Sequence, residues 1–266
     1  MTKRIYPSDL SDEEWKYLKK CLPKQRNFGR PRKYERREIL NACFYLLRTG
    51  CAWRYLPSDY PDWQSVYQYF RAWRKSDVWR RLNKKLRRLL RKKLGRQTQA
   101  SAGCLDSQSV KTCETARRGE TVGYDAGKRV KGRKRHILVD TLGLLMVVKV
   151  HAANISETAG GQFVLKELIE SFWRLRLIWL DGGYMKGLFE YLKSLKRWRE
   201  VKLEQVKRSD GQKGFVLLPK RWVVERTFAW LNKQRRLSKD YETLTETSEA
   251  MIYAAMVRLM LGRLGT

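Results

Sequence analysis

The sequence predicts an α/β domain with a mixed five-stranded sheet, preceded by a small all-α domain that resembles a helix-turn-helix unit. Apolar residues recur at helical spacing up to about residue 93, and a polar stretch rich in small residues follows at 94–103. After that stretch, short runs of β-branched and apolar residues alternate with helical segments. We therefore expect two domains, residues 1–95 and 96–266.

The first domain is expected to consist of helices separated by turn residues. Ser11 followed by Glu14 is typical of a capping box at the start of a helix. The segment 33–50 carries apolar residues at helical spacing and ends at a glycine, which indicates a second helix. Two prolines then precede a third helix, which should begin near Asp62 and reach Trp73.

This third helix is a candidate for DNA reading, because two helices joined by a turn form the usual frame of a helix-turn-helix reader. Its expected buried stripe consists of Trp63, Val66, Phe70 and Trp73. The side chains expected to face DNA are Gln64, Ser65, Gln68 and Arg71. The same pattern also fits a helix that positions the DNA, contacts a second copy of the chain, or serves only as scaffold.

Charge indicates the class of partner. The chain of 266 residues has 58 Lys and Arg against 27 Asp and Glu, a formal net charge of +31, which favours a polyanion such as nucleic acid. The basic run 80–93 fits phosphate contact as well as a solvated helix face. We expect no membrane association, since the sequence has neither an apolar run of membrane-spanning length nor a signal-peptide pattern. The five cysteines form no zinc pattern and suggest reduced core residues of a cytosolic protein.

The second domain has a distinctive order of elements. In sequence it should contain a strand at 104–111, a hairpin at 135–152 with its turn at 140–143, a helix at 157–173, a strand at 175–180, a helix at 185–198, a strand at 200–206 and a helix at 220–237. Three antiparallel strands would thus be followed by two strands added through crossover helices. This is the strand order of the ribonuclease H-like fold.

Carboxylates mark two strands of this sheet and its last helix. Asp106 lies in or at the end of the first strand, and Asp181 directly follows the fourth, before Gly182 and Gly183. If these strands are adjacent and parallel, the two carboxylates converge, and Glu225 could supply a third oxygen ligand. Such a set suits Mg²⁺ that also binds phosphate oxygens. Taken singly, Asp106 also fits a turn or cap, and Glu225 also fits an ion pair with Arg221.

Several segments closely resemble the DDE transposases encoded by bacterial insertion sequences. They are "CLDSQSVK", "GRKRHILVDTLGLLMVVKVHAANISETAGG", "LDGGYMKG" and "RWVVERTFAWLNKQRRLSKDYE", and the N-terminal part resembles the helical domain of one group of these enzymes. The resemblance covers nearly the whole chain. It implies a ribonuclease H-like catalytic domain, two Mg²⁺ or Mn²⁺ ions, and Asp106, Asp181 and Glu225 as the catalytic, metal-binding triad.

The sequence departs from the family around the third acid, which lies in a Tyr-x2-Arg-x3-Glu-x6-Lys signature. Arg221 and Glu225 match, whereas Leu218 and Asn232 stand at the tyrosine and lysine positions, so that Lys233 is the candidate replacement. We expect Arg221, Lys233 and the basic loop 127–136 to neutralise the DNA backbone, although such a loop could also be a solvated turn. The candidate DNA contacts of that loop are Arg133, Lys134 and Arg135.

The resemblance implies a transposase that binds the ends of its mobile element and carries out metal-dependent strand cleavage and strand transfer. Its partners would be double-stranded DNA, namely the terminal inverted repeats and the target, and further copies of the chain in a homodimer or larger oligomer. The expected location is the cytoplasm, with the protein on the nucleoid when DNA-bound. Two alternatives remain open: a catalytically inactive DNA-binding derivative, and a metal-dependent nuclease without strand transfer.

Overall fold

A computed structural model describes residues 6–23, 33–113, 121–168, 172–195, 200–206 and 221–265. The chain forms two compact units. Unit 1 comprises Met1–Arg96, Leu231–Ser238 and Ala250–Thr266, and unit 2 comprises Gln97–Trp230 and Lys239–Glu249. The first boundary lies one residue from the predicted one, but two later segments return to unit 1. A single division at 95/96 is therefore too simple.

The N-terminal part of unit 1 is helical, as predicted. Its elements are α1 (Asp12–Cys21), α2 (Arg36–Thr49), the short 3-10 helix η1 (Trp53–Tyr55), α3 (Trp63–Lys75) and α4 (Val78–Lys93). The predicted capping box begins α1: Ser11 Oγ accepts from the Glu14 amide at 3.2 Å, and Glu14 Oε2 accepts from the Ser11 amide at 2.9 Å. Gly50 ends α2 with a φ of +77°, as expected for a helix-terminating glycine.

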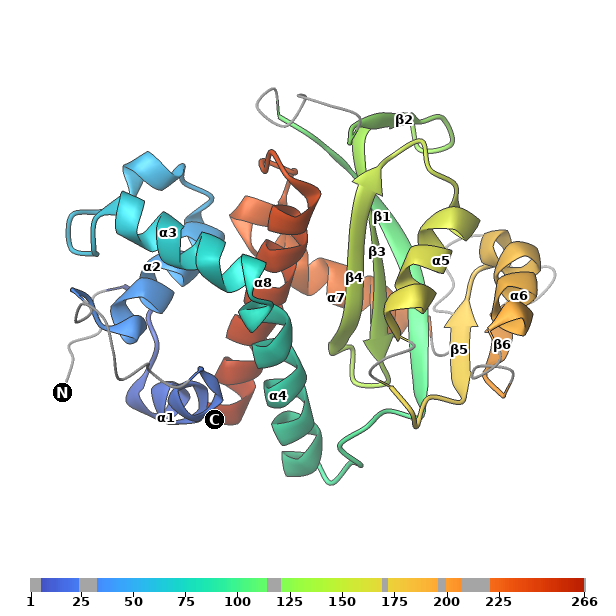
Figure 1. The fold of residues 1–266 in the computed structure, drawn as a ribbon, viewed down its shortest axis with the longest axis horizontal. Coiled ribbons are helices and arrows are strands. Elements are labelled where there is room, and N and C mark those ends of the chain that lie inside the picture. Colours follow the sequence, from blue (N-terminus) through green and yellow to red (C-terminus); the bar gives the residue numbers. More distant parts are fainter. Residues whose placement is uncertain are drawn as a thin grey trace. The chain divides into compact units, whose positions relative to one another are not determined.

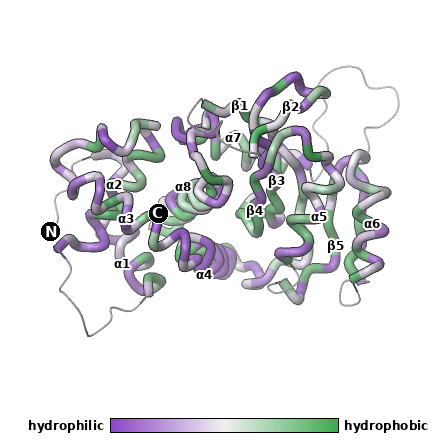
Figure 2. The backbone as a smooth tube through the Cα atoms, turned by 45° about the horizontal axis from the view of Figure 1, so that its top comes forward, coloured by the Kyte–Doolittle hydropathy of each residue, from purple (hydrophilic) through white to green (hydrophobic). Residues whose placement is uncertain are grey.

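The third helix begins where the sequence predicts. Asp62 is its N-cap and accepts a hydrogen bond from the Ser65 amide at 2.8 Å. Three of the four residues of the predicted stripe are buried, whereas Trp63 is only half-buried, with the guanidinium of Arg54 lying 4.8 Å from its ring centroid. The next helix, α4, buries an apolar side, but Figure 2 shows it largely purple because basic residues fill the rest of its surface.

The return of the chain to unit 1 after unit 2 was not predicted. The segment expected as one helix at 220–237 is α7 (Trp222–Asn232) followed by the 3-10 helix η5 (Arg235–Leu237), and Lys220 lies outside the described residues. A further helix, α8 (Thr245–Gly265), passes from unit 2 into unit 1. Within unit 1, Arg258 pairs with Glu14 at 2.7 Å. The segments of unit 1 are therefore joined by specific polar contacts.

Unit 2 is built on a mixed sheet of six strands. They are β1 (Ala102–Lys111), β2 (Gly123–Asp125), β3 (Val130–Asp140), β4 (Leu145–Ala152), β5 (Leu177–Leu180) and β6 (Lys202–Gln205). The path is β2-β3-β1-β5-β6, with β4 also paired to β3. The pairs β1–β3 and β3–β4 are antiparallel, whereas β1–β5 and β5–β6 are parallel. Apart from the extra short strand β2, this is the predicted arrangement, and it agrees with a ribonuclease H-like fold.

Two helices cover one face of this sheet, namely α5 (Glu157–Leu168) and α6 (Met185–Ser194), as Figure 1 shows. The core on this face includes Leu105, Leu165, Ile178 and Leu188. Because successive strand residues point to opposite faces, Asp106 points away from Leu105 and toward Arg221, at the start of α7. The candidate site therefore lies on the face opposite α5. No helix among the described residues combines the length and apolar composition needed to cross a bilayer.

Candidate active site

The sheet register brings two of the predicted acids together. In the parallel pair of β1 and β5, Ala102 lies opposite Leu177 and Cys104 opposite Trp179. Asp106 and Asp181 each follow the last pair of this ladder by two residues, and their carboxylates lie 3.8 and 3.5 Å from the Arg221 guanidinium. The same position in the pleat means that both side chains project to the same face.

Local backbone geometry fixes each of these carboxylates. Asp106 Oδ1 accepts from the Ser107 amide at 2.8 Å, and Asp181 Oδ1 accepts from the Gly182 amide at 2.6 Å. Asp181 thereby caps the 3-10 helix η3 (Gly182–Tyr184). A Cβ at Gly182 would lie 2.5 Å from Gln205 Nε2, so glycine allows the turn to pass close to the end of β6.

The third acid, Glu225, joins the other two through Arg221. The Arg221 guanidinium lies 3.8 Å from Asp106 Oδ2, 3.5 Å from Asp181 Oδ2 and 3.9 Å from Glu225 Oε1. Its side chain is 15% exposed, against 55% for Asp181 and 47% for Glu225. Three carboxylates from two strands and one helix thus surround a single cationic group.

The electrostatics of this triad favour a cation. The pKa of Asp106 is raised to about 6, mainly by burial and in part by Glu157, whereas the Ser107 amide, Arg221 and Lys128 act in the opposite direction. A carboxyl group whose ionised form is disfavoured by burial gains most from an added positive charge. Arg221 supplies part of that charge at distances longer than those of a close ion pair.

The donor set also fits a divalent metal. Hard oxygen ligands are those that Mg²⁺ and Mn²⁺ prefer, and Asp106, Asp181 and Glu225 would hold such an ion. Within the described ranges no three ligand-type side chains already lie close enough together to form a metal-binding group. The guanidinium of Arg221 lies among the carboxylates instead, so metal binding would require it to shift.

Comparisons with protein families agree with this geometry. The model of the transposase DDE domain matches residues 97–260, which is more than half of the chain, and a model of transposases of the IS4/5 family matches residues 10–83. The chain belongs to the DDE transposase family. The comparison with curated proteins found no match. The first match covers all of unit 2, and the second covers α1–α3 and the start of α4.

Three basic residues predicted to contact DNA do not lie in a loop of this transposase. Arg133, Lys134 and Arg135 belong to strand β3, and they are 0%, 5% and 1% exposed. Arg133 pairs with Asp240 at 3.2 Å, and Lys134 lies 3.3 Å from Glu157. The prediction that these side chains contact the DNA backbone is therefore wrong in this conformation, because each is buried inside unit 2.

The other predicted DNA contacts are accessible. On α3, Gln64, Gln68 and Arg71 are exposed and Ser65 is half-buried. Lys233 is exposed after the end of α7, and its carbonyl accepts from Arg48 Nη1 at 2.8 Å. Leu218, at the tyrosine position of the family signature, lies outside the described residues.

The sequence also contains a polar cluster that was not predicted to matter. Glu157, in the first turn of α5, accepts hydrogen bonds from Ser107 at 2.7 Å and Tyr184 at 2.9 Å, and His136 Nε2 lies 3.0 Å from it. An acid in the first turn of a helix is usually explained by the helix dipole. In the sequence, the one feature that could have indicated this cluster is that Ser107 follows Asp106 by one residue and Tyr184 follows Asp181 by three.

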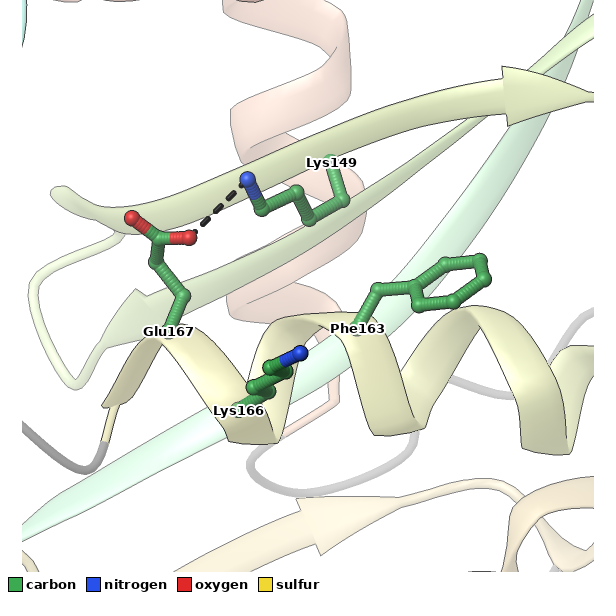
Figure 3. A pocket seen from close by; sticks show the side chains of 4 residues that line it. All are labelled: Lys149, Phe163, Lys166 and Glu167. Atoms are coloured by element: carbon green, nitrogen blue, oxygen red, sulfur yellow. Dashed lines mark ion pairs between the residues drawn. The ribbon is translucent and has the colours of Figure 1, made fainter.

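A separate surface pocket of about 440 Å³ lies between β4 and α5. Figure 3 shows its lining residues Lys149, Phe163, Lys166 and Glu167, with the Lys149 ammonium 2.9 Å from Glu167. Neither Asp106 nor the other two acids of the triad line it. Its one acid, Glu167, is paired with Lys149, so the carboxylate triad remains the candidate catalytic centre.

Proposed function

We propose that this member of the DDE family is a transposase that binds the ends of its own mobile element and catalyses metal-dependent DNA cleavage and strand transfer. The observation that carries the proposal is the convergence of Asp106, Asp181 and Glu225 around Arg221. A fold needs no such convergence of acids for its own stability, since like charges close together repel each other.

The residues of the site have distinct roles in this proposal. Asp106, Asp181 and Glu225 would hold the Mg²⁺ or Mn²⁺ ions, two by the family's mechanism, and the bound metal would supply Lewis-acid activation of the attacking and leaving oxygens. Arg221 moves from the carboxylates to a phosphate of the bound DNA, which lies on the exposed side of Asp181 and Glu225. Gly182 allows the turn at the end of β5 to stay close to β6, which leaves room for a bulky polyanion.

Unit 1 would bind the ends of the element. The exposed side chains of α3, namely Gln64, Gln68 and Arg71, would meet the major groove, with half-buried Ser65 beside them. The basic surface of α4 would contact phosphates. Double-stranded DNA is thus the proposed partner, both as terminal inverted repeats and as target, in a complex that contains at least two copies of the chain.

The decisive experiment incubates the full-length protein with duplexes that carry the ends of its element, a target plasmid and Mg²⁺. Joined products support strand transfer, and Asp106→Asn protein is the matched control. Nicked ends without joined products would instead favour a nuclease that only hydrolyses. End binding without any cleavage, in Mg²⁺ or Mn²⁺, would favour an inactive DNA-binding derivative.

A further inference from the structure

One carboxylate on the far side of β1 contacts both segments that carry the first two acids. Ser107 donates to Glu157 Oε2 at 2.7 Å, and Tyr184 donates to the same oxygen at 2.9 Å. Ser107 directly follows Asp106 in β1, and Tyr184 ends the 3-10 helix η3, which Asp181 caps. Glu157 therefore links strand β1, next to Asp106, to the turn that follows Asp181.

The direction of the side chains separates Glu157 from the metal-binding face. Ser107 and Asp106 are neighbours in a strand and point to opposite faces, so a group bonded to Ser107 lies behind the strand that carries Asp106. Tyr184 is 1% exposed and packs in the core between the sheet and helices α5 and α6. Glu157 therefore affects Asp106 and Asp181 through the neighbouring residues Ser107 and Tyr184, and it is not placed to bind the metal itself.

The charge of Glu157 is set by its surroundings. Burial acts to raise its pKa, but hydrogen bonds from His136, Ser107 and Tyr184 outweigh burial and hold the pKa well below its usual value. Lys134, which is 6% exposed, lies 3.3 Å from Oε1. The group is therefore an anion at neutral pH, and hydrogen bonds to an ionised acceptor are shorter and stronger than neutral ones.

The two histidines of this cluster extend it into the sheet. His136 Nδ1 lies 2.8 Å from His151 Nε2, and both rings are buried. Burial lowers the pKa of each imidazole, that of His151 to about 4. A neutral His136 can donate its Nε2–H to Glu157 and still accept at Nδ1. The position of Glu157 is thus fixed from three elements besides its own helix, namely β1, β3 and η3.

We propose that Glu157 is a positioning residue of the phosphoryl-transfer site, which holds Ser107 and Tyr184 so that Asp106 and Asp181 face one metal-binding centre. The inference rests on the proposed function. Among the groups that contact Glu157, Ser107 and Tyr184 belong to the two segments that carry the acids, so the carboxylate links those segments directly. Glu167, on the same helix, provides the contrast, because its partner is Lys149, beside the surface pocket.

The test measures metal binding directly. Full-length protein is titrated against Mn²⁺ and the free ion is followed by electron paramagnetic resonance, with the thermal midpoint of the metal-free protein recorded in parallel. Glu157→Gln should weaken Mn²⁺ binding about 10- to 100-fold, the usual effect of losing a residue that orients metal ligands. Glu167→Gln is the matched control on the same helix and should bind Mn²⁺ like the wild type.

Two further variants separate positioning from folding. Ser107→Ala and Tyr184→Phe each remove one hydrogen bond to Glu157, and each should weaken Mn²⁺ binding several-fold with a small change in thermal midpoint. They replace Glu157→Gln as the test if that protein does not fold. Glu157→Asp keeps the charge and should restore part of the affinity that Glu157→Gln loses.

The outcomes distinguish this inference from the proposed function. If the wild type binds no Mn²⁺, or if Asp106→Asn still binds it, the proposed metal site at the three acids would be wrong. A second set of outcomes would overturn only the role of Glu157. In these, Asp106→Asn loses Mn²⁺ binding, but folded Glu157→Gln binds Mn²⁺ like the wild type. The same holds if Ser107→Ala and Tyr184→Phe both bind Mn²⁺ like the wild type.

Discussion

Two arginines of unit 2, Arg133 and Arg221, both lie near carboxylates but differ in burial and in how closely they are paired. Arg133 is fully buried, pairs with Asp240 at 3.2 Å, and donates to the Glu242 carbonyl at 2.7 Å and the Thr243 carbonyl at 2.8 Å. Its Nε and Nη2 also donate to Thr121, at 3.2 and 2.9 Å. Arg221, by contrast, lies 3.5 to 3.9 Å from three carboxylates, two of which are about half exposed.

The difference separates a structural cation from an exchangeable one. A buried guanidinium whose donors are all used cannot move without leaving unpaired charges, which is strongly unfavourable. A partly exposed guanidinium that lies 3.5 to 3.9 Å from three carboxylates can be displaced by metal ions and can then bind a phosphate. The same residue type therefore supports the fold at position 133 and lies among the acids of the candidate site at position 221.

The largest effect should follow from removing an acid near Arg221. Asp106→Asn, Asp181→Asn and Glu225→Gln should each reduce DNA cleavage about a thousandfold or more, because each removes a charged ligand worth several kcal/mol in the transition state. Binding to element ends, measured by gel shift, should stay nearly unchanged. Comparable cleavage by any one variant in Mg²⁺ would exclude that residue from the triad.

The next largest effect concerns stability. Arg133→Met should lower the free energy of unfolding by about 3–5 kcal/mol, because Asp240, at 1% exposure, is left without its ion-pair partner. Arg221→Met is the matched variant and should change the same quantity by about 1 kcal/mol or less, as partly exposed pairs do. Urea unfolding of both proteins tests the contrast, and equal losses would contradict it.

A third effect depends on pH and comes from the buried histidines. The pKa of His151 falls from 6.5 to about 4 on folding, so its contribution to stability is full above pH 6.5 and is lost as the pH falls toward 4. The shift corresponds to a loss on the order of 3 kcal/mol. Urea unfolding from pH 7.5 to pH 4.5 should show a smaller decline for His151→Gln than for the wild type. Parallel declines would mean that His151 does not titrate in this way.

The smallest effects should come from exposed residues of unit 1. Gln64→Ala and Gln68→Ala should each relax preference at particular base pairs by about 1–3 kcal/mol without changing the salt dependence of binding. Arg71→Ala should weaken all duplexes alike and reduce the salt slope by about one phosphate contact. Binding titrations at several salt concentrations test both. Full end discrimination in both glutamine variants would make α3 structural.

The approach of Asp106 and Asp181 could be predicted from sequence because it depends on strand order. Once β1 and β5 are predicted to be adjacent and parallel, Asp106 and Asp181 must approach each other, whatever the loops do. The basic residues at 133–135 could not be placed in the same way. Asp240, the ion-pair partner of Arg133, lies 107 residues away, and local sequence contains no sign of that pairing. Strand β3 also begins at Val130, inside the expected loop.

Helix α8 and Glu157 were missed for two other physical reasons. In α8, every residue from Ala250 to Val257 is buried. This stretch therefore lacks the alternation of an apolar and a polar side by which a surface helix is recognised in sequence. Glu157 looks like an ordinary acid in the first turn of a helix until Ser107 and Tyr184 are seen to converge on it.

The return of the chain to unit 1 has a consequence for synthesis on the ribosome. When residues 1–96 have emerged, Leu231–Ser238 and Ala250–Thr266 are still missing, and Arg258, which pairs with Glu14, has not been made. Unit 1 is completed only after all of unit 2 has been translated. A nascent or prematurely ended chain therefore lacks part of the unit proposed to bind DNA.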